Sequence, residues 1–270
     1  MEVLHLTDLH LDCAVELGRF DEALASLRAE VDAVPEAPVV ITGDIATGTT
    51  FQDLLPRLWA AIGRRRTLFV LGNHDAWGTG IARSRLAAAN LSRKREDLTY
   101  LGATPAVVVS DVAFVGVDGW YDCRAGDVNG TTVRMNDWAQ VDEFRGLHLS
   151  RIREVCGRLA QRDTHRAEGR LRVVLNAYDR VVFVTHVPPF PEACAWPGGA
   201  SDRYHLPYFC NFTLGLALSR VAADYPSKSI TVLCGHGHGA ADVRVADNLR
   251  VVAGAAEYGC PRVSDVVEVP

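Results

Sequence analysis

The sequence predicts a mixed α/β fold in which two mixed β-sheets pack together and helices cover their outer faces. Short runs of aliphatic residues, typical of buried strands, alternate with amphipathic helical segments through the first third of the chain. Later apolar runs are paired across short polar turns, which is typical of β-hairpins. The length of 270 residues and the apolar content of 48% suit a globular protein, and we expect a single domain over residues 1–270.

Five apolar runs are expected to form buried strands. Each is short and consists mostly of aliphatic or β-branched residues, which favour a strand that is covered on both faces. The runs are Val3–Leu6, Val39–Ile41, Leu68–Leu71, Val181–Val184 and Ile230–Leu233.

The segments between these runs show helical or hairpin patterns. Apolar side chains recur every three or four residues from Phe20 to Val31 and from Phe51 to Ile62, so each segment presents one apolar helix face. A long polar stretch, roughly 137–177, is also expected to be helical. Hairpins are expected at 107–117, around Ser110-Asp111, and at 242–253, around Asp247-Asn248; residues 263–269 would then close a sheet.

Composition disfavours several classes of protein. The chain has 28 Lys and Arg against 33 Asp and Glu, a net charge of −5, whereas proteins that bind nucleic acid mainly by charge are basic. No apolar run approaches the roughly 20 residues of a membrane-spanning helix. The first residues lack the pattern of a signal peptide, and the seven cysteines form no C-x-x-C pair. We therefore expect a cytoplasmic protein with no membrane partner.

The most informative feature is a set of polar residues placed directly after the five apolar runs. Every run is succeeded within a few residues by Asp, Asn or His, and ligands of open α/β sheets bind beyond the carboxyl ends of the strands. We therefore expect these side chains to converge in one polar cluster. The candidate metal ligands are Asp8, His10, Asp44, Asn73, His186, His236 and His238.

The residue types in this cluster point to two divalent transition-metal ions. Imidazole and carboxylate without thiolate suit Mn, Fe, Zn, Co or Ni better than an all-oxygen Ca²⁺ or Mg²⁺ site. Seven ligands are too many for one tetrahedral ion but suffice for two if Asp44 bridges them. The two ions would outweigh the charges of Asp8 and Asp44, so the site should attract an anionic ester. Gly43, Gly72 and Gly235 would let the backbone turn beneath the crowded site.

The candidate ligands fall in five short blocks of the sequence. In order, these are Asp8-x-His10, Gly43-Asp44, Gly72-Asn73-His74-Asp75, His186 and Gly235-His236-x-His238. Taken together, the five blocks resemble the calcineurin-like metallophosphoesterase superfamily. The resemblance implies a four-layer α/β/β/α sandwich with the metals at one edge of the sheets. It also implies that one ion is held by Asp8, His10, Asp44 and His238, and the other by Asp44, Asn73, His186 and His236.

The expected activity is metal-dependent hydrolysis of a phosphoester. A hydroxide bridging the two ions would attack phosphorus in line, because bound metal lowers the pKa of water towards ~7. His74 is expected to be a catalytic residue that faces the substrate and stabilises or protonates the leaving oxygen. Asp75 is expected to fix the His74 ring. The resemblance supports both roles.

The five blocks do not separate the activities of the superfamily. The presence of both His236 and His238 resembles its phosphodiesterase and nuclease branches, so we favour a phosphodiesterase acting on a small or nucleotide-like diester. A phosphomonoesterase, such as a nucleotidase or a protein phosphatase-like enzyme, is the alternative. A metal-binding module without catalytic activity is a second alternative. Manganese is among the expected ions. The sequence determines neither which metal is bound nor the oligomeric state.

Several further residues are weighed as contacts for the substrate. Trp120 and Tyr121 come after another apolar run, and Tyr204 and His205 lie in an irregular segment after His186; for each, ordinary packing or solvent exposure is the alternative. A basic set on the expected helix after Asp75 would suit a nucleic-acid backbone, but a solvated helix face is favoured because the net charge is negative. This set consists of Arg83, Arg85, Arg93, Lys94 and Arg95.

Overall fold

The computed structural model describes residues 1–270 and contains two large β-sheets. The first sheet has the strand order β13-β1-β2-β3-β4. Strands β1 to β4 are parallel, and β13 closes the edge antiparallel to β1. The strands are β1 (Glu2–Leu6), β2 (Val39–Ile41), β3 (Thr67–Phe69), β4 (Leu98–Tyr100) and β13 (Asp265–Glu268).

The second sheet has the order β11-β12-β10-β7-β6-β5. Its central strands are parallel, and a hairpin adds an antiparallel strand at each edge. The strands are β5 (Val107–Val109), β6 (Val112–Gly116), β7 (Arg180–Val184), β10 (Ser229–Cys234), β11 (Ala241–Ala246) and β12 (Leu249–Ala253). A separate small hairpin is formed by β8 (Ala195–Trp196) and β9 (Gly199–Ala200).

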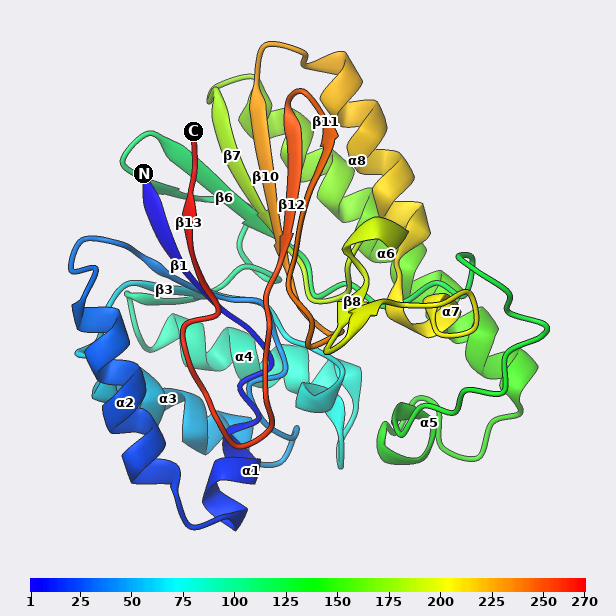
Figure 1. The fold of residues 1–270 in the computed structure, drawn as a ribbon, viewed down its shortest axis with the longest axis horizontal. Helices are drawn as coiled ribbons and strands as arrows, with labels where there is room; N and C mark the ends of the chain where they lie inside the picture. The colour runs from blue at the N-terminus through cyan, green and yellow to red at the C-terminus, as the bar shows by residue number, and fades with distance from the viewer.

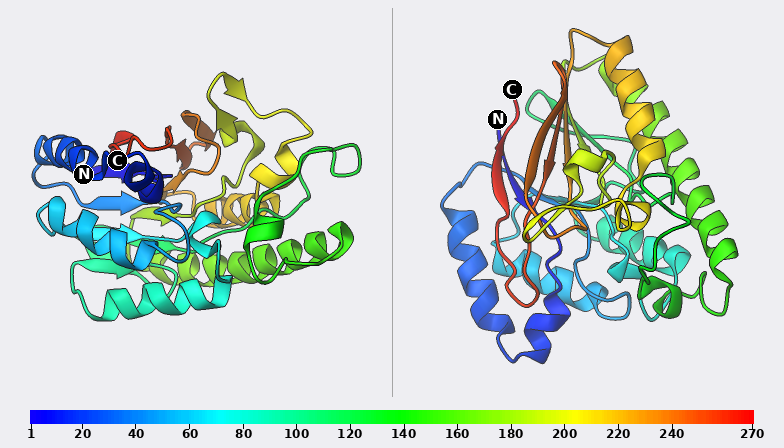
Figure 2. Two further views of the ribbon diagram at one scale, coloured as in Figure 1. Left: turned by 90° about the horizontal axis from the view of Figure 1, so that it is seen from below. Right: turned by 45° about the vertical axis from the view of Figure 1, so that its right-hand side comes forward.

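Helices cover the outer face of each sheet, so the molecule has four layers (Figures 1 and 2). The helices on the first sheet are α1 (Leu11–Glu16), α2 (Phe20–Asp32), α3 (Phe51–Ala61) and α4 (Ile81–Arg93). Those on the second sheet are α6 (Leu149–Leu175) and α8 (Phe212–Asp224). Short helical turns lie in the connections: η1 (His74–Ala76), α5 (Asp137–Gln140), η2 (Pro191–Ala193) and α7 (Leu206–Phe209).

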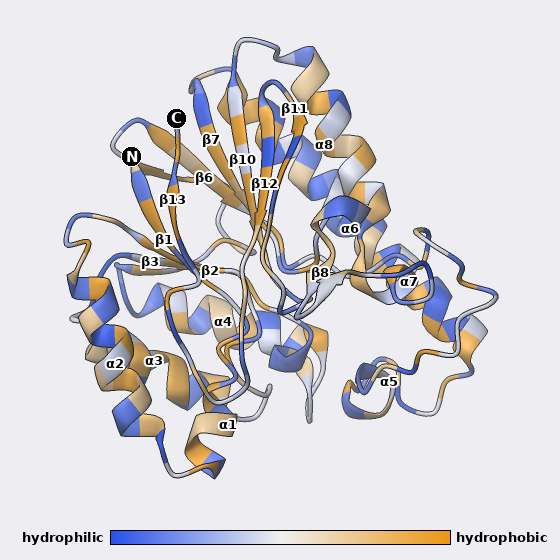
Figure 3. Cartoon of the chain, viewed as in Figure 1, coloured by the Kyte–Doolittle hydropathy of each residue, from blue (hydrophilic) through white to orange (hydrophobic).

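The core consists of three apolar layers between the four layers of secondary structure. Alternate residues of one strand serve different layers, because successive side chains point to opposite faces of a sheet. Val40 packs between the two sheets, whereas its neighbours Val39 and Ile41 pack beneath the helices. A third layer joins the second sheet to α6 and α8. Figure 3 shows the resulting apolar strands and the polar outer faces of the helices.

The structure confirms the predicted α/β/β/α sandwich, with most element ends within two residues of expectation. The predicted helix over 137–177 is wrong at its start, because a short α5 precedes a break and α6 begins only at Leu149. The chain leaves the helix at Val141, which is extended at φ −98° and ψ 127°, and it turns at Gly146, where φ is 78°. No helix in the structure combines the length and the apolar character needed to span a membrane.

The topology gathers the loops at the strand ends. The two termini lie side by side at one end of the molecule, where β1 pairs with β13 (Figure 1). The loops after β1, β2, β3, β7 and β10 all meet at the opposite, carboxyl end of the parallel strands. The candidate ligands lie in these loops.

Candidate metal centre

The loops that carry the candidate ligands have an uncommon backbone conformation. Left-handed φ angles occur at Asp8 (47°), His10 (40°), Asp44 (50°), His236 (72°) and His238 (60°). Only three other non-glycine residues of the chain have a positive φ. Such conformations cost of order 1–3 kcal/mol each and cluster at functional sites, where the surrounding structure enforces them.

One group of ligand atoms combines the loops after β1 and β10. The metal-binding atoms of Asp8, His10 and His238 all lie within 4.8 Å of one another. The Nε2 atoms of His10 and His238 are 3.2 Å apart, and His238 Nε2 lies 3.5 Å from Asp8 Oδ1. This spacing suits a single ion bound by two imidazoles and a carboxylate.

A second group combines the loops after β2, β3, β7 and β10. The ligand atoms of Asp44, His186 and His236 lie within 4.8 Å of one another. Asn73 Oδ1 is 3.0 Å from both His186 Nε2 and His236 Nδ1. Asp44 places one carboxylate oxygen 3.5 Å from His186 and the other 3.9 Å from His10 of the first group. Asp44 therefore lies between the two groups, and all seven predicted ligands come together.

Hydrogen bonds to the backbone determine which nitrogen of two histidines faces the cluster. His186 Nδ1 lies 2.8 Å from the carbonyl oxygen of Thr42, and His236 Nε2 lies 3.0 Å from that of Tyr208. A carbonyl only accepts hydrogen bonds, so each of these nitrogens carries the ring hydrogen. The other nitrogens, His186 Nε2 and His236 Nδ1, face each other at 3.2 Å. Two lone pairs at this distance repel unless a cation lies against them, so the donor set fits a metal ion.

The electrostatics of the cluster also favour a cation. Burial lowers the pKa of His10 and of His236 to about 3, so both rings are neutral at neutral pH, which is the form that binds metal. Burial, and then the charges of Asp8 and Asp75, raise the pKa of Asp44 well above its usual value. Positive charge at this position would relieve the repulsion between the buried carboxylates.

Glycines make room for the crowded loops. A Cβ on Gly72 would lie 2.1 Å from Asp44 Oδ1, and one on Gly235 would lie 1.8 Å from Thr7 Oγ1 and 2.3 Å from Asp8 Oδ2. At Gly43 a Cβ would lie 2.5 Å from the backbone nitrogen of Gly72, and φ is also positive at 98°. At Gly72 and Gly235 the requirement is therefore space for the metal-bearing carboxylates rather than an unusual turn.

His74 lies at the edge of the cluster, in η1. Its Nε2 is 3.8 Å from Asp44 Oδ2, and its ring stacks on Trp77 with centroids 3.5 Å apart. The side chain keeps 15% of its surface exposed, whereas Asp44 keeps 2%. His74 is therefore held in a fixed orientation by Trp77 and remains accessible from the solvent side.

The expectation that Asp75 fixes the His74 ring is wrong. Asp75 is fully buried, and its carboxylate accepts hydrogen bonds from the backbone N–H groups of Ile45, Ala46 and Gly72 at 3.0, 3.1 and 2.8 Å. These N–H groups belong to the loops that carry Asp44 and Asn73. Asp75 therefore ties two metal-bearing loops together and does not touch the ring of its neighbour.

A buried residue missed in the sequence, Asp137 of α5, orients Asn73. Asp137 Oδ1 accepts from Asn73 Nδ2 at 2.8 Å and from Trp77 Nε1 at 2.7 Å, while Oδ2 accepts from the Tyr121 hydroxyl at 3.1 Å. Because the amide nitrogen is engaged, Asn73 Oδ1 faces His186 and His236. Nothing local in the sequence marks this role, since Asp137 stands 64 residues from Asn73 in a polar stretch.

Comparison with known proteins identifies the family of the chain. Residues 1–240 match the model of the calcineurin-like phosphoesterase family. The chain belongs to this family. It is a metal-dependent phosphoester hydrolase, and the predicted resemblance is confirmed.

Solved structures share the fold of this phosphoesterase at low sequence identity. A Thermus thermophilus protein is 15% identical, with a TM-score of 0.54, over 94% of this chain and 88% of the other. A dimetal phosphatase from Danio rerio is also 15% identical, with a TM-score of 0.54, over 94% of this chain and 87% of the other. A search of curated proteins finds no match.

The four residues considered as substrate contacts of the phosphoesterase differ in their exposure to solvent. Trp120 and Tyr121 are 3% and 0% exposed, so direct contact with a substrate is wrong for both: Trp120 packs on Phe144, and Tyr121 supports Asp137. Tyr204 and His205 are partly exposed. His205 lies 5.4 Å from the Trp196 ring, so its contact with substrate remains a prediction.

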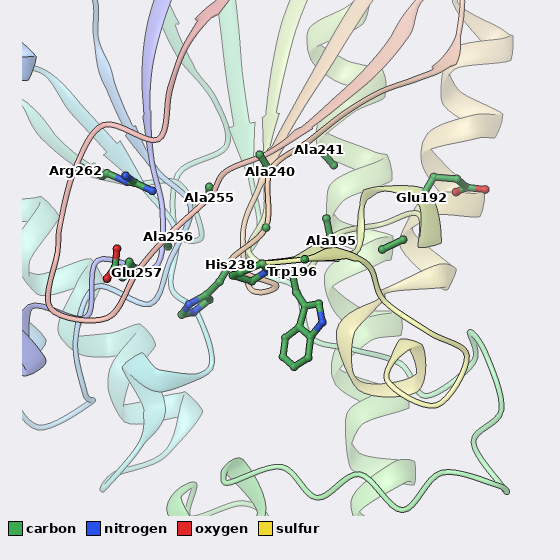
Figure 4. A pocket seen from close by; sticks show the side chains of 15 residues that line it. Glu192, Ala195, Trp196, His238, Ala240, Ala241, Ala255, Ala256, Glu257 and Arg262 are labelled. Carbon is green, nitrogen blue, oxygen red and sulfur yellow. The ribbon is translucent and has the colours of Figure 1, made fainter.

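A groove that the sequence did not indicate opens beside the metal centre. A cavity of about 370 Å³ is lined by Trp196, Phe209, His236, His238 and Tyr258, among others. The Tyr258 ring lies 4.3 Å from that of His10 and 4.7 Å from that of His238. A second cavity of about 650 Å³ shares Trp196 and His238 with the first and extends between the β8–β9 hairpin and residues 255–257 (Figure 4).

Contrary to expectation, the basic residues after η1 are not all solvated. Arg83 is 80% exposed, but Arg85 turns inward and is only 17% exposed. Its guanidinium pairs with Asp118 at 2.6 Å and with Asp163 at 2.7 Å. Arg85 is therefore part of a buried ion-pair network and is not available to a nucleic-acid backbone.

Proposed function

We propose that this phosphoesterase hydrolyses a small phosphodiester with the help of two divalent metal ions. The convergence of seven ligands in two groups around Asp44 carries the proposal. One ion would be held by Asp8, His10, Asp44 and His238, and the other by Asp44, Asn73, His186 and His236. The neutral imidazoles and carboxylates suit Mn, Fe, Zn, Co or Ni.

The metal ions, His74 and the buried aspartates would have different roles in the reaction. Two bound ions supply an acidified water and neutralise charge on the phosphoryl oxygens. Burial lowers the pKa of His74 to about 2, so its ring is neutral and one ring nitrogen carries a hydrogen. Stacked on Trp77 at the accessible edge of the cluster, His74 would stabilise the leaving oxygen of the substrate by a hydrogen bond from its ring N–H. Asp75 and Asp137 act as positioning residues.

The shape of the groove favours a diester over a monoester. A diester carries two organic groups on one phosphorus, so its site needs space in two directions from the metals. The cavities of about 370 and 650 Å³ meet at His238, which gives this space. Trp196 and Tyr258, which are 48% and 50% exposed, offer rings for apolar or aromatic substituents.

We also infer that residues 1–270 act as one domain. The family match ends at residue 240, but β11, β12 and β13 lie beyond it. These strands complete the edges of both sheets. Tyr258, beside the metal centre, lies in the same segment of the chain.

A compact substrate panel tests the diester preference. We expect the protein, loaded in turn with Mn²⁺, Zn²⁺ or Ni²⁺, to hydrolyse bis-(p-nitrophenyl) phosphate faster than p-nitrophenyl phosphate, as measured by release of nitrophenol. Activity on the monoester alone would refute the diesterase assignment in favour of a phosphomonoesterase. Two bound ions without activity on either ester would identify a metal-binding module without catalysis.

Replacing Asp137 with asparagine is expected to weaken metal binding. The substitution removes the charge that holds the Asn73 amide, and loss of such supporting groups typically costs about 10–100-fold in metal affinity. Competition with a fluorescent chelator would measure the affinity of the weaker ion. Asp142→Asn, at a side chain that is 41% exposed, is the control. Equal affinities in both variants would show that Asn73 needs no such support.

A further inference from the structure

A third cavity, with four arginines among its eleven lining residues, lies between α4 and α6 and shares no residue with the groove at the metal centre. Its volume is about 630 Å³, which falls in the range of pockets for small ligands. Its charged lining consists of Arg85, Glu143, Arg162, Arg166 and Arg170. This concentration of guanidinium groups is unexpected in a protein of net charge −5.

The acidic groups near the cavity are engaged, except that Asp163 Oδ1 accepts no hydrogen bond. Arg85 pairs with both Asp118 and Asp163. Glu143 accepts hydrogen bonds from the backbone N–H groups of Ile81 and Ala82, at 2.9 and 3.2 Å, and so caps the start of α4. Of the three arginines of α6, Arg166 and Arg170 have no carboxylate partner, and Arg162 has only a distant one in Asp163.

These three arginines lie on one face of α6 and repel one another. Arg162, Arg166 and Arg170 are spaced at intervals of four residues, and like charges at this spacing destabilise a helix. Arg170 donates only to the carbonyl oxygens of Leu101, Gly102 and Gly116. Burial, and then the charge of Arg166, lower the pKa of Arg170.

Arg162 and Arg166 line the cavity at its solvent-exposed side. The structure contains no hydrogen bond or ion pair for the Arg166 side chain. Arg162 Nε lies 3.8 Å from Asp163 Oδ1, while Arg85 pairs with the other oxygen of Asp163. The two terminal nitrogens of Arg162 make no ion pair or hydrogen bond. A ligand with negative charge would supply a partner to Arg166 and to the terminal nitrogens of Arg162.

The inner wall of the cavity is held in place before any ligand binds. The Asp118 carboxylate accepts from Arg85 Nε at 2.6 Å, from the Tyr100 hydroxyl at 2.8 Å and from the Leu71 backbone N–H at 3.0 Å. Arg170 is anchored by its three carbonyl partners. A fixed wall lowers the entropy cost of binding.

We propose that this cavity is a binding site for a small phosphate-bearing anion, separate from the metal centre. Guanidinium groups bind phosphate through paired, charge-assisted hydrogen bonds, and Arg162 and Arg166 have such donors free. The bound phosphate would also relieve the repulsion along α6. The cavity volume leaves room for an organic group attached to that phosphate.

Equilibrium dialysis of the metal-loaded full chain against radiolabelled inorganic phosphate tests the proposal. The cavity variant is Arg162→Ala/Arg166→Ala. The control is Arg151→Ala/Arg158→Ala, which removes the same charge from exposed positions of the same helix. We expect the cavity variant to bind one phosphate fewer per chain than the wild type, or the same number with at least about tenfold weaker affinity at one site.

The control variant is expected to match the wild type in number and affinity. Phosphate bound at the metal centre is common to all three proteins and cancels in the comparison. Identical binding by the wild type and the cavity variant would overturn the proposal. Equal loss in the cavity and control variants would overturn it too, because it would reduce the effect to the net charge of α6. None of these outcomes depends on the substrate of the metal centre.

Discussion

Replacing His74 with alanine is expected to abolish most turnover while both metal ions remain bound. The side chain lies at the accessible edge of the cluster, where a donor to the leaving oxygen is needed, and loss of such a group typically costs about 10²- to 10⁴-fold in rate. The buried ligands Asp44 and Asn73 do not depend on the imidazole for their hydrogen bonds, since His74 contacts Asp44 Oδ1 through its backbone N–H at 2.8 Å. Turnover of a nitrophenyl diester and elemental analysis of the same preparation give both quantities.

The same experiment decides between two roles for His74. Its Nε2 belongs to a group with His10 and Asp44 whose ligand atoms lie within 4.8 Å of one another, so the geometry also permits direct metal binding. Loss of one ion per chain in parallel with activity would make His74 a ligand and contradict its catalytic role. His165→Ala, at an exposed position on α6, controls for the loss of a histidine as such.

Replacing Asp44 with asparagine is expected to have the largest effect on the metal centre. The carboxylate lies between the two groups of ligands, at 3.5 Å from His186 and 3.9 Å from His10, and the neutral amide cannot offer a charged oxygen to each ion. We expect loss of at least one ion per chain, together with a loss of activity greater than the about 10–100-fold typical of supporting residues. Elemental analysis and diester turnover measure both.

The metal-free protein gives an independent measure of the same charge. Burial and the charges of Asp8 and Asp75 raise the pKa of Asp44, so a charged Asp44 destabilises the fold when no metal is bound. Asp44→Asn should therefore raise the melting temperature of the chelator-treated protein and lower that of the metal-loaded protein. Asp142→Asn should change neither. A variant that keeps two ions and wild-type activity would exclude Asp44 as the bridge.

The strands and the ligand-bearing loops were predictable because their signals are local. Runs such as Val39–Ile41 are apolar at every position, since β2 is covered by helices on one face and by the other sheet on the opposite face. Asp44 comes shortly after that run, so its place at the carboxyl end of a strand can be read from a few residues. The prediction of a helix directly before α6 was wrong because the local pattern there was misleading. Residues 141–148 carry Val141, Phe144 and Leu147 at the three-residue spacing of a helix face, and the break follows from the backbone conformations of Val141 and Gly146.

Roles that depend on distant partners were not predictable. Asp75 stands beside His74 in the sequence, yet its carboxylate accepts hydrogen bonds from the backbone N–H groups of Ile45, Ala46 and Gly72. Trp120 and Tyr121 follow the end of β6 near the site, but neighbouring elements cover them almost completely. In each case the direction of a side chain depends on tertiary packing, which composition and periodicity do not encode.

The sequence by itself determined the four-layer architecture and the seven residues that meet at the strand ends, because hydrophobic periodicity and strand-end positions are properties of short segments. Only the tertiary structure decided how these residues are held and what lies beside them. Asp137 lies 64 residues from Asn73 in the sequence but bonds to it, and Trp196 and Tyr258 line the groove from separate segments. The arginines of α6 line a separate cavity together with residues of α4. Each of these arrangements arises from contacts between elements far apart in the chain, so its physical cause lies in the packing of the layers.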